Sequence, residues 1–250
     1  MRLVRFMHGG RTGYGVHDGE KVYATCWEPF DRIEEEPQPL EESDVTMLAP
    51  SVPSKIVAVG LNYSDHAAEF GLEIPEEPVL FLKASSTLLD PGGAVVYPAQ
   101  SLRVDYEAEL AVVMGAEARS LSEDEAPGAV LGYTCGLDMT ARDLQLKDGQ
   151  WTRAKNFDTF CPLGPWVETD LDPGDLAIEL RLNGEVRQSS GTSRMIFGVP
   201  ALVSFISGVM TLYPGDVILT GTPPGVGEVR RGDEVSMTIE GIGTLSVTIS

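Results

Sequence analysis

The sequence predicts a mostly β fold with short helices (α+β), in which a small N-terminal β unit precedes a larger domain. Short runs of branched, aromatic and apolar residues recur along the chain, separated by Gly, Pro or Asn-Gly turns. Two hairpin patterns alternate polar and apolar residues on both arms. Residues 28–44 are acidic and rich in Pro, which is typical of a loop or linker. We therefore expect an N-terminal β domain over residues 1–50 and a main domain over residues 51–250.

Each expected element follows from its local pattern. Three short strands, RLVRFMH, TGYGVH and KVYATCW, fill residues 1–27 between Gly-containing turns. Apolar or alternating runs then predict the strands and hairpins of the main domain, namely KIVAVG (55–60), VLFLK (79–83), VDYEAELAVVMG (104–115), VLGYTCGLD (130–138), LAIELRLNGEVRQSS (176–190), LYPGDVILTGTPPGV (212–226) and EVSMTIEGIGTLSVTI (234–249). Residues 198–209 are expected to form a helix.

Composition limits the classes of protein and partner. The chain has 250 residues, of which 42% are hydrophobic and 22% charged, as in a soluble globular protein. Its net charge of −20 argues against nucleic acid or an anionic membrane as a partner. The three cysteines show no Cys-x-x-Cys spacing, and the N-terminus lacks the apolar segment of a secretion signal. We expect a cytoplasmic protein.

The segment from Val104 to Gly115 carries an unusual row of acidic residues. Side chains alternate along a strand, so Asp105, Glu107 and Glu109 share one face. Carboxylates held together repel one another, and a divalent cation such as Mg²⁺ would remove that repulsion. The same pattern also fits an edge strand with a solvated acidic face, and the segment alone does not separate the two interpretations.

A short helix is expected after the first strand of the main domain, capped by Asn62 or Ser64 and ended by Gly71. His66 and Glu69 lie three residues apart on it and are therefore neighbours. A carboxylate beside an imidazole is the arrangement of a general base. The alternative is an ordinary ion pair on a solvated helix.

Several further polar residues follow predicted strands. Lys83 closes one strand and points either into a site, where it would bind substrate, or to solvent. Asp138 ends another and is either a turn residue or part of a site with Arg142 and Gln145, which lie three apart on the next helix. That helix is expected to start with a capping box, Thr140-x-x-Asp143. Lys155 is a further candidate cation for a site.

The loop TGTPPG, residues 220–225, combines backbone N–H groups with the hydroxyls of Thr220 and Thr222. Such a loop can hold a carboxylate or an oxyanion, although glycines in a loop are also plain turn formers.

Together these segments resemble the fumarylacetoacetate hydrolase family. The resemblance rests on GLNYSDHAAE, FLKASST, DYEAELAVVMG, GLDMTARDLQ, RAKNFDTFCPLGP, NGEVRQSSGTSRMIF and MTLYPGDVILTGTPPGVG, which occur in this order. It covers about residues 53–250. The N-terminal unit resembles that of bacterial acylpyruvate hydrolases and 2-hydroxyhepta-2,4-diene-1,7-dioate isomerases.

The resemblance implies a mixed β-sandwich roll or barrel, a catalytic role for residues 51–250, and a homodimer. It implies that Glu107, Glu109 and Asp138 hold one Mg²⁺ or Mn²⁺, which leaves Asp105 as a structural partner. His66 and Glu69 would then form the acid/base pair, with Lys155 near the substrate oxygens. The pocket is expected to be lined by Arg142, Gln145 and Thr222. Larger fumarylacetoacetases have an aspartate in the place of Asn62, so this chain is expected to take smaller substrates.

The expected substrate is a small anionic 2-oxo or β-diketo acid, chelated through its keto and carboxylate oxygens. The expected reaction is C–C cleavage, either by hydrolysis, as of acylpyruvates, or by decarboxylation, as of oxaloacetate. The first alternative is keto–enol or double-bond isomerisation in aromatic catabolism, because the same chelate stabilises a dienolate. A third hypothesis, from another class, is a non-catalytic small-molecule-binding protein.

Overall fold

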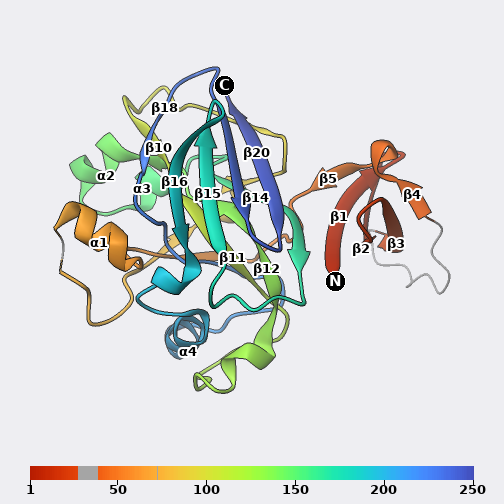
Figure 1. Cartoon of the computed structure of the whole chain (residues 1–250), viewed down its shortest axis with the longest axis horizontal. Coiled ribbons are helices and arrows are strands. Elements are labelled where there is room, and N and C mark those ends of the chain that lie inside the picture. The colour runs from red at the N-terminus through yellow and green to blue at the C-terminus, as the bar shows by residue number, and fades with distance from the viewer. Residues whose placement is uncertain (28–38, 72) are drawn as a thin grey trace.

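The structure, a computed structural model, describes residues 1–27, 39–71 and 73–250. Strands dominate this part of the chain and form sheets of 12, 3 and 5 strands (Figure 1). Its four α-helices are all short. The hydrogen-bonded order of the large sheet runs from β4 at one end to β7 at the other, so that sheet is open and not a closed barrel. The predicted fold class, mostly β with short helices, is confirmed.

The N-terminal strands form a lobe beside the main body (Figure 1). They are antiparallel neighbours in the order β4, β3, β2 and β1, and β5 pairs with β1. Their bounds are β1 (Arg2–His8), β2 (Arg11–His17), β3 (Lys21–Trp27), β4 (Pro39–Glu41) and β5 (Thr46–Leu48). The three strands expected within residues 1–27 are therefore present. Most of the predicted linker, residues 28–38, lies outside the described residues, and residues 39–44 form β4 and a 3₁₀ turn, Glu42–Asp44.

The lobe shares its sheet with the main body. At the start of β1, Arg2 and Leu3 pair with Glu168 and Val167 of β14 (Cys161–Glu168). The amino group of Met1 donates to the Glu168 carboxylate at 2.5 Å. The large sheet is consequently continuous from the lobe into the body.

In the body, the large sheet continues through β14, β12, β11, β17, β6 and β7. The bounds are β6 (Ile56–Val59), β7 (Leu80–Lys83), β11 (Ala108–Met114), β12 (Val130–Leu137) and β17 (Val217–Leu219), and β8 (Leu88–Leu89) pairs with β14. All four residues of β6 and all three of β17 are buried. This explains why these strands appear in the sequence as continuous apolar runs.

Asp216 ties the start of β6 to the start of its parallel neighbour β17. Its carboxylate accepts hydrogen bonds from the backbone N–H and hydroxyl of Ser54, at 3.0 and 2.6 Å, and from the backbone N–H of Lys55 at 3.1 Å. It also accepts from the Tyr213 backbone N–H and the Lys55 ammonium. Burial alone would raise the pKa of Asp216, but these hydrogen bonds, from Lys55 and Ser54 above all, hold it below its ordinary value.

Two smaller sheets complete the body. The three-stranded sheet has the order β13, β10, β18, and the five-stranded sheet has the order β16, β15, β19, β20, β9. The bounds are β9 (Ala94–Val95), β10 (Val104–Tyr106), β13 (Thr140–Ala141), β15 (Ala177–Leu182), β16 (Glu185–Gly191), β18 (Gly227–Val229), β19 (Glu234–Ile239) and β20 (Gly243–Ile249). Both predicted hairpins are present, as β15–β16 and β19–β20.

The main core lies where the five-stranded sheet packs against β11, β12 and β14. Helix α4 (Val199–Val209), expected over 198–209, adds Leu202, Val203 and Ile206, all fully buried. Burying one such side chain contributes about 1.5–3 kcal/mol. Among the helices of the described residues, none is long and apolar enough to cross a membrane.

The remaining helices are α1 (Ser64–Phe70), α2 (Arg142–Asp148) and α3 (Thr152–Lys155). Gly71 ends α1 in the left-handed conformation, as predicted. The predicted caps are wrong, because the residue before α1 is Tyr63 and the residue before α2 is Ala141, and neither makes a side-chain cap. The expected cap residues have other partners: Thr140 lies in β13, and Asp143 accepts from the hydroxyl of Ser101 at 2.6 Å.

Candidate active site

Three buried carboxylates meet where β11 and β12 pair. The predicted strand over residues 104–115 is interrupted at Glu107, which separates β10 from β11. Glu109 follows in β11, and Asp138 comes directly after β12. The antiparallel register sets Ala108 opposite Leu137, and the backbone N–H of Asp138 donates to the carbonyl of Glu107 at 2.9 Å. Asp138 and Glu107 are thus brought together from distant parts of the sequence.

One ligand atom from each of Glu107, Glu109 and Asp138 lies within 4.8 Å of the others. Burial, and then the charges of Asp138 and Glu107, raise the pKa of Glu109 well above its ordinary value. Its own hydrogen-bond donor is the backbone N–H of Gly221, at 2.6 Å. A cluster of buried carboxylate oxygens suits a hard divalent cation, which would compensate this charge. The residues present therefore fit Mg²⁺ or Mn²⁺.

Two ammonium groups border the carboxylates. Lys155, at the end of α3, donates to Glu107 at 2.8 Å and to Asp138 at 2.5 Å. Lys83, at the end of β7, donates to the other oxygen of Asp138 at 2.5 Å and to the carbonyl of Lys155 at 2.7 Å. A third, longer hydrogen bond joins it to the carbonyl of Met139. All three N–H groups of Lys83 therefore have protein acceptors.

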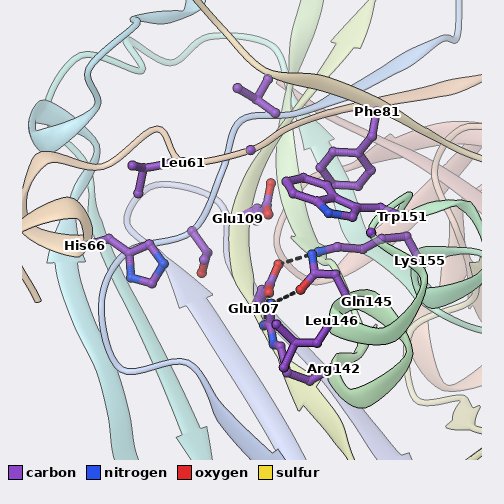
Figure 2. A pocket seen from close by; sticks show the side chains of 14 residues that line it. Leu61, His66, Phe81, Glu107, Glu109, Arg142, Gln145, Leu146, Trp151 and Lys155 are labelled. Atoms are coloured by element: carbon purple, nitrogen blue, oxygen red, sulfur yellow. Dashed lines mark hydrogen bonds and ion pairs between the residues drawn. The ribbon is translucent and has the colours of Figure 1, made fainter. Parts of the chain in front are cut away.

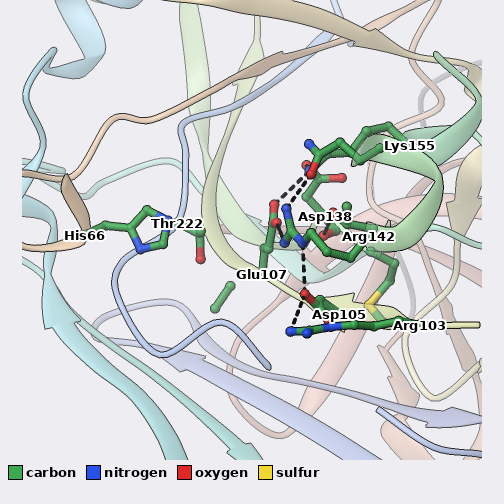
Figure 3. A network of polar contacts seen from close by, with 12 residues as sticks. His66, Arg103, Asp105, Glu107, Asp138, Arg142, Lys155 and Thr222 are labelled. Atoms are coloured by element: carbon green, nitrogen blue, oxygen red, sulfur yellow. Dashed lines mark hydrogen bonds and ion pairs between the residues drawn. The ribbon is translucent and has the colours of Figure 1, made fainter. Parts of the chain in front are cut away.

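On the other side of Glu107, Arg142 links it to Asp105. The guanidinium donates to Asp105 at 2.9 Å, to Gln145 at 2.6 Å and to Glu107. Asp105 also accepts from Arg103 at 2.8 Å (Figure 3). Burial alone would raise the pKa of Glu107, but Lys155 and Arg142 hold it well below its ordinary value.

These contacts form one chain of alternating charges from the surface to the interior. We call it the charge ladder, and its members in order are Arg103, Asp105, Arg142, Glu107, Lys155, Asp138 and Lys83. Its outer end is half-exposed and its inner end is fully buried.

His66 and Glu69 lie together on α1, as their spacing predicted. His66 Nδ1 is 3.2 Å from Glu69 Oε2. The entry to α1 is held by Asn62, whose buried amide bonds the carbonyl of Thr220 at 2.7 Å and both backbone groups of Phe197. Asn62 is therefore a structural residue here, and its side chain does not reach the cavity.

A cavity of about 430 Å³ collects most of the predicted site residues. The predicted residues that line it are Glu107, Glu109, His66, Arg142, Gln145, Lys155 and Thr222. Figure 2 shows His66 on one side, facing Arg142, Gln145 and Lys155 across Glu107 and Glu109. Three predicted site residues do not line the cavity, namely Lys83, Asp138 and Glu69. Glu69 contacts His66, and Asp138 contacts Lys155, and both of these partners line the cavity. Lys83 contacts Asp138.

Sequence reasoning missed the apolar wall of the cavity, which comprises Val59, Leu61, Phe81, Leu146 and Trp151. It also missed Gln188, a buried residue of β16 that contacts Thr222. The apolar residues look like ordinary core positions, and Gln188 sits in a hairpin of mostly polar residues. Neither pattern distinguishes a site residue from a structural one.

Gly221 shows why the TGTPPG loop needs glycine. Its φ of 95° is in the left-handed region, and a Cβ there would lie 2.8 Å from the Cβ of Asn62. This conformation lets the backbone N–H of Gly221 reach Glu109, and it brings Thr222 to the cavity.

The fold and this cluster of carboxylates belong to a known class. Residues 55–250 match the model of the fumarylacetoacetate hydrolase C-terminal family, and residues 1–50 match the Rv2993c-like N-terminal family. The chain is therefore a member of the fumarylacetoacetate hydrolase family. This confirms the resemblance seen in the sequence.

Among its relatives, human mitochondrial oxaloacetate tautomerase FAHD2A is 46% identical over 219 residues, which are 82% of this chain and 70% of that protein. The structure of 2-hydroxyhepta-2,4-diene-1,7-dioate isomerase from Mycobacterium marinum matches with a TM-score of 0.91 and 43% identity, covering 100% of this chain and 98% of the other. Fumarylpyruvate hydrolase from Pseudomonas aeruginosa, in complex with Mn²⁺ and pyruvate, matches with a TM-score of 0.74 and 36% identity, covering 82% and 91%. Relatives of this chain thus include isomerases and hydrolases.

Proposed function

We propose that this protein is a Mg²⁺- or Mn²⁺-dependent enzyme that forms the enolate of a small 2-oxo acid, and that its principal reaction is keto–enol tautomerisation. The observation that carries the proposal is the single cavity that joins two parts. One part is the carboxylate cluster, which lines the cavity through Glu107 and Glu109, and the other is the His66–Glu69 pair, which lines it through His66. Enolisation needs these two parts and no bound water.

The cation would be held by Glu107, Glu109 and Asp138. When bound, it would supply Lewis-acid stabilisation of the negative charge that develops on the keto oxygen. Glu69 holds the Nδ1 side of the His66 ring, so Nε2 would take the proton from the carbon next to the keto group and deliver it to the enolate oxygen, which gives the enol. Lys155 borders Glu107 and Asp138 and would lie next to the substrate oxygens.

The substrate carboxylate would be bound by Gln145 and Thr222. Gln145 accepts from Arg142 through Oε1, which leaves its amide nitrogen as the donor for a ligand. Arg142 already bonds Asp105, Glu107 and Gln145, so we assign it mainly to holding these groups. Lys83 likewise has only protein acceptors, and we assign it to holding Asp138 and not to substrate binding.

The second candidate is the C–C cleavage expected from the sequence, by hydrolysis of acylpyruvates or by decarboxylation. The favouring observation is the size of the cavity, about 430 Å³, which has room for a water molecule beside a small 2-oxo acid. For hydrolysis, His66 would activate that water. The relatives named as a tautomerase and an isomerase support the proton-transfer reaction more directly.

The test is one activity panel on the purified protein with Mg²⁺, with Mn²⁺ and after EDTA treatment. Oxaloacetate is followed for enol formation by ultraviolet absorbance and for CO₂ release, and acetylpyruvate is followed for hydrolysis. We expect metal-dependent enol equilibration to be the fastest reaction. Faster hydrolysis would favour the second candidate. Binding of 2-oxo acids without any turnover would instead identify a non-catalytic binding protein.

We also propose that residues 1–50 and 51–250 are separate domains, and that the protein is a cytoplasmic homodimer. The two family matches support the division near residue 50. Expression of residues 51–250 alone, tested for a cooperative thermal transition, checks the division. Light scattering on a sizing column checks the dimer, and a mass of one chain would contradict it.

A further inference from the structure

We propose that Gln188 is a positioning residue for substrate binding, because its buried amide makes the hydroxyl of Thr222 a hydrogen-bond donor directed at the cavity. The inference rests on the proposed function, since the acceptor would be an anionic oxygen of the 2-oxo acid.

Gln188 lies in β16 and is 1% exposed. Its Oε1 accepts a hydrogen bond of 2.9 Å from the backbone N–H of Ala108. Its Nε2 donates two hydrogen bonds, one of 2.9 Å to the hydroxyl oxygen of Thr222 and one of 2.8 Å to the carbonyl of Pro223. Both amide hydrogens and the amide oxygen therefore have partners.

The orientation of this amide is fixed by the chemistry of its neighbours. A backbone N–H can only donate, so the group facing Ala108 must be the amide oxygen. A backbone carbonyl can only accept, so the group facing Pro223 must be the amide nitrogen. In a flipped amide, the amide oxygen would face the Pro223 carbonyl, acceptor against acceptor, and the amide N–H groups would face the Ala108 N–H, donor against donor. Neither pair can form a hydrogen bond, and burial would make this costly.

This orientation dictates what Thr222 can do. Its oxygen accepts from Gln188, so its single hydroxyl hydrogen must point elsewhere. Thr222 lines the cavity, and Figure 3 shows it between His66 and Glu107. Within the described residues no other hydrogen bond is made by the Thr222 hydroxyl. Its hydrogen is therefore the natural donor for an anionic ligand held at the carboxylate cluster.

Gln188 also ties this donor to the carboxylate cluster. Ala108, the first residue of β11, lies between Glu107 and Glu109. One side chain therefore sets the position of the TGTPPG loop relative to the strand that carries both glutamates. The hydrogen-bond donor on the loop would therefore keep a fixed position relative to a ligand held at the two glutamates.

The first part of the test compares two variants of Thr222. Thr222→Val removes the hydroxyl at nearly constant shape, and Thr222→Ser keeps it. Binding of oxalate, an inert dianion related to 2-oxo acids, is measured by calorimetry on the full chain saturated with Mg²⁺. We expect the valine variant to bind oxalate about 10- to 100-fold more weakly, the loss typical of one hydrogen bond to a charged group, and the serine variant to bind like the wild type.

The second part places Gln188 in a double-mutant cycle. Gln188→Glu has the same shape but no N–H donor, so the Thr222 hydroxyl would turn to donate to the new carboxylate and not to the ligand. We expect weaker oxalate binding by this variant, and a smaller weakening by the same substitution in the Thr222→Val background, where only the added negative charge acts. Thermal transitions of all variants confirm that the compared proteins are folded.

Each outcome has one meaning. Equal oxalate affinity in wild type and Thr222→Val would overturn the inference, and so would a Gln188→Glu effect that is just as large in the valine background. If Gln188→Glu does not fold, the valine and serine pair still decides whether the hydroxyl donates. Failure of the wild type itself to bind oxalate with Mg²⁺ would instead count against the proposed function.

Discussion

Lys83 donates a hydrogen bond of 2.5 Å to Asp138, and both side chains are fully buried. A buried charge that loses its partner keeps the cost of its desolvation, so such a pair is far more sensitive to single substitution than a surface pair. Asp138 also has Lys155 as a partner, on its other oxygen. The cluster thus depends on the polar contacts behind it as well as on the residues that line the cavity.

Replacing Lys83 with Met should lower the free energy of unfolding by about 3–5 kcal/mol, the usual cost of breaking a buried ion pair. Urea unfolding monitored by fluorescence measures it. Lys147→Met, at an exposed position of α2, is the matched control and should change stability by less than about 0.5 kcal/mol. Similar effects of the two substitutions would contradict the role given to Lys83.

Glu107→Gln should weaken Mn²⁺ binding at least about 100-fold, since even partners one step removed from a metal cost 10–100-fold. The substitution removes the negative charge and one of the two oxygens that accept from Arg142 and Lys155. Metal content after dialysis, measured by atomic emission, reports the effect. Glu117→Gln, on an exposed loop, is the control, and unchanged metal content in Glu107→Gln would refute the assignment.

His66→Ala should reduce kcat by about 100- to 10,000-fold, the usual contribution of a general base. Mn²⁺ affinity should change little, because the residues proposed to hold the ion are Glu107, Glu109 and Asp138. His8→Ala in the N-terminal lobe serves as the control and should retain full activity. If His66→Ala kept wild-type turnover, the general-base assignment would be wrong.

The hydrogen bonds of Asp216 make its contribution to stability depend on pH. Its pKa is lower in the folded protein than the ordinary value of about 3.9, so its stabilising effect is complete above that value and is lost as the pH falls through the folded pKa. Asp216→Asn should therefore destabilise the protein by about 1–3 kcal/mol at pH 7. The difference from wild type should shrink below about pH 4.

Unfolding curves for wild type and Asp216→Asn at pH 7, 5 and 3.5 test this expectation. A difference that stays constant over this range would mean that the carboxylate charge plays no part. Ser54→Ala, which removes one hydrogen bond and no charge, should show a smaller and less pH-dependent loss.

Local patterns in the sequence were sufficient for most strands. The β19–β20 hairpin and the buried strand β6 follow directly from alternation and from an apolar run. The helix caps failed because their side chains have tertiary partners: Asp143 bonds Ser101, and Asn62 bonds Thr220. A polar side chain near a helix start can bond either the helix backbone or a residue far away in the sequence. The spacing of residues in the sequence does not reveal the distant partner.

The site was predictable where residues share one element and less so where the fold joins them. The closeness of His66 to Glu69 follows from one helix turn. The meeting of Asp138 with Glu107 depends on the register of β11 with β12, and no local pattern specifies it. The link between Gln188 and Thr222 depends on the docking of two different sheets and was not anticipated.

The alternating charges of the charge ladder also limit which substitutions this site can accept during evolution. Every inner member touches neighbours of the opposite sign, so reversing or removing one charge leaves two like charges facing each other, or one with no counterpart. Favourable substitutions in the charge ladder must therefore occur in complementary pairs. The effect of replacing one ladder residue depends on the charge of its neighbour in the ladder. Laboratory evolution for new substrates should accordingly alter the apolar wall of the cavity, one residue at a time, well before it alters the ladder.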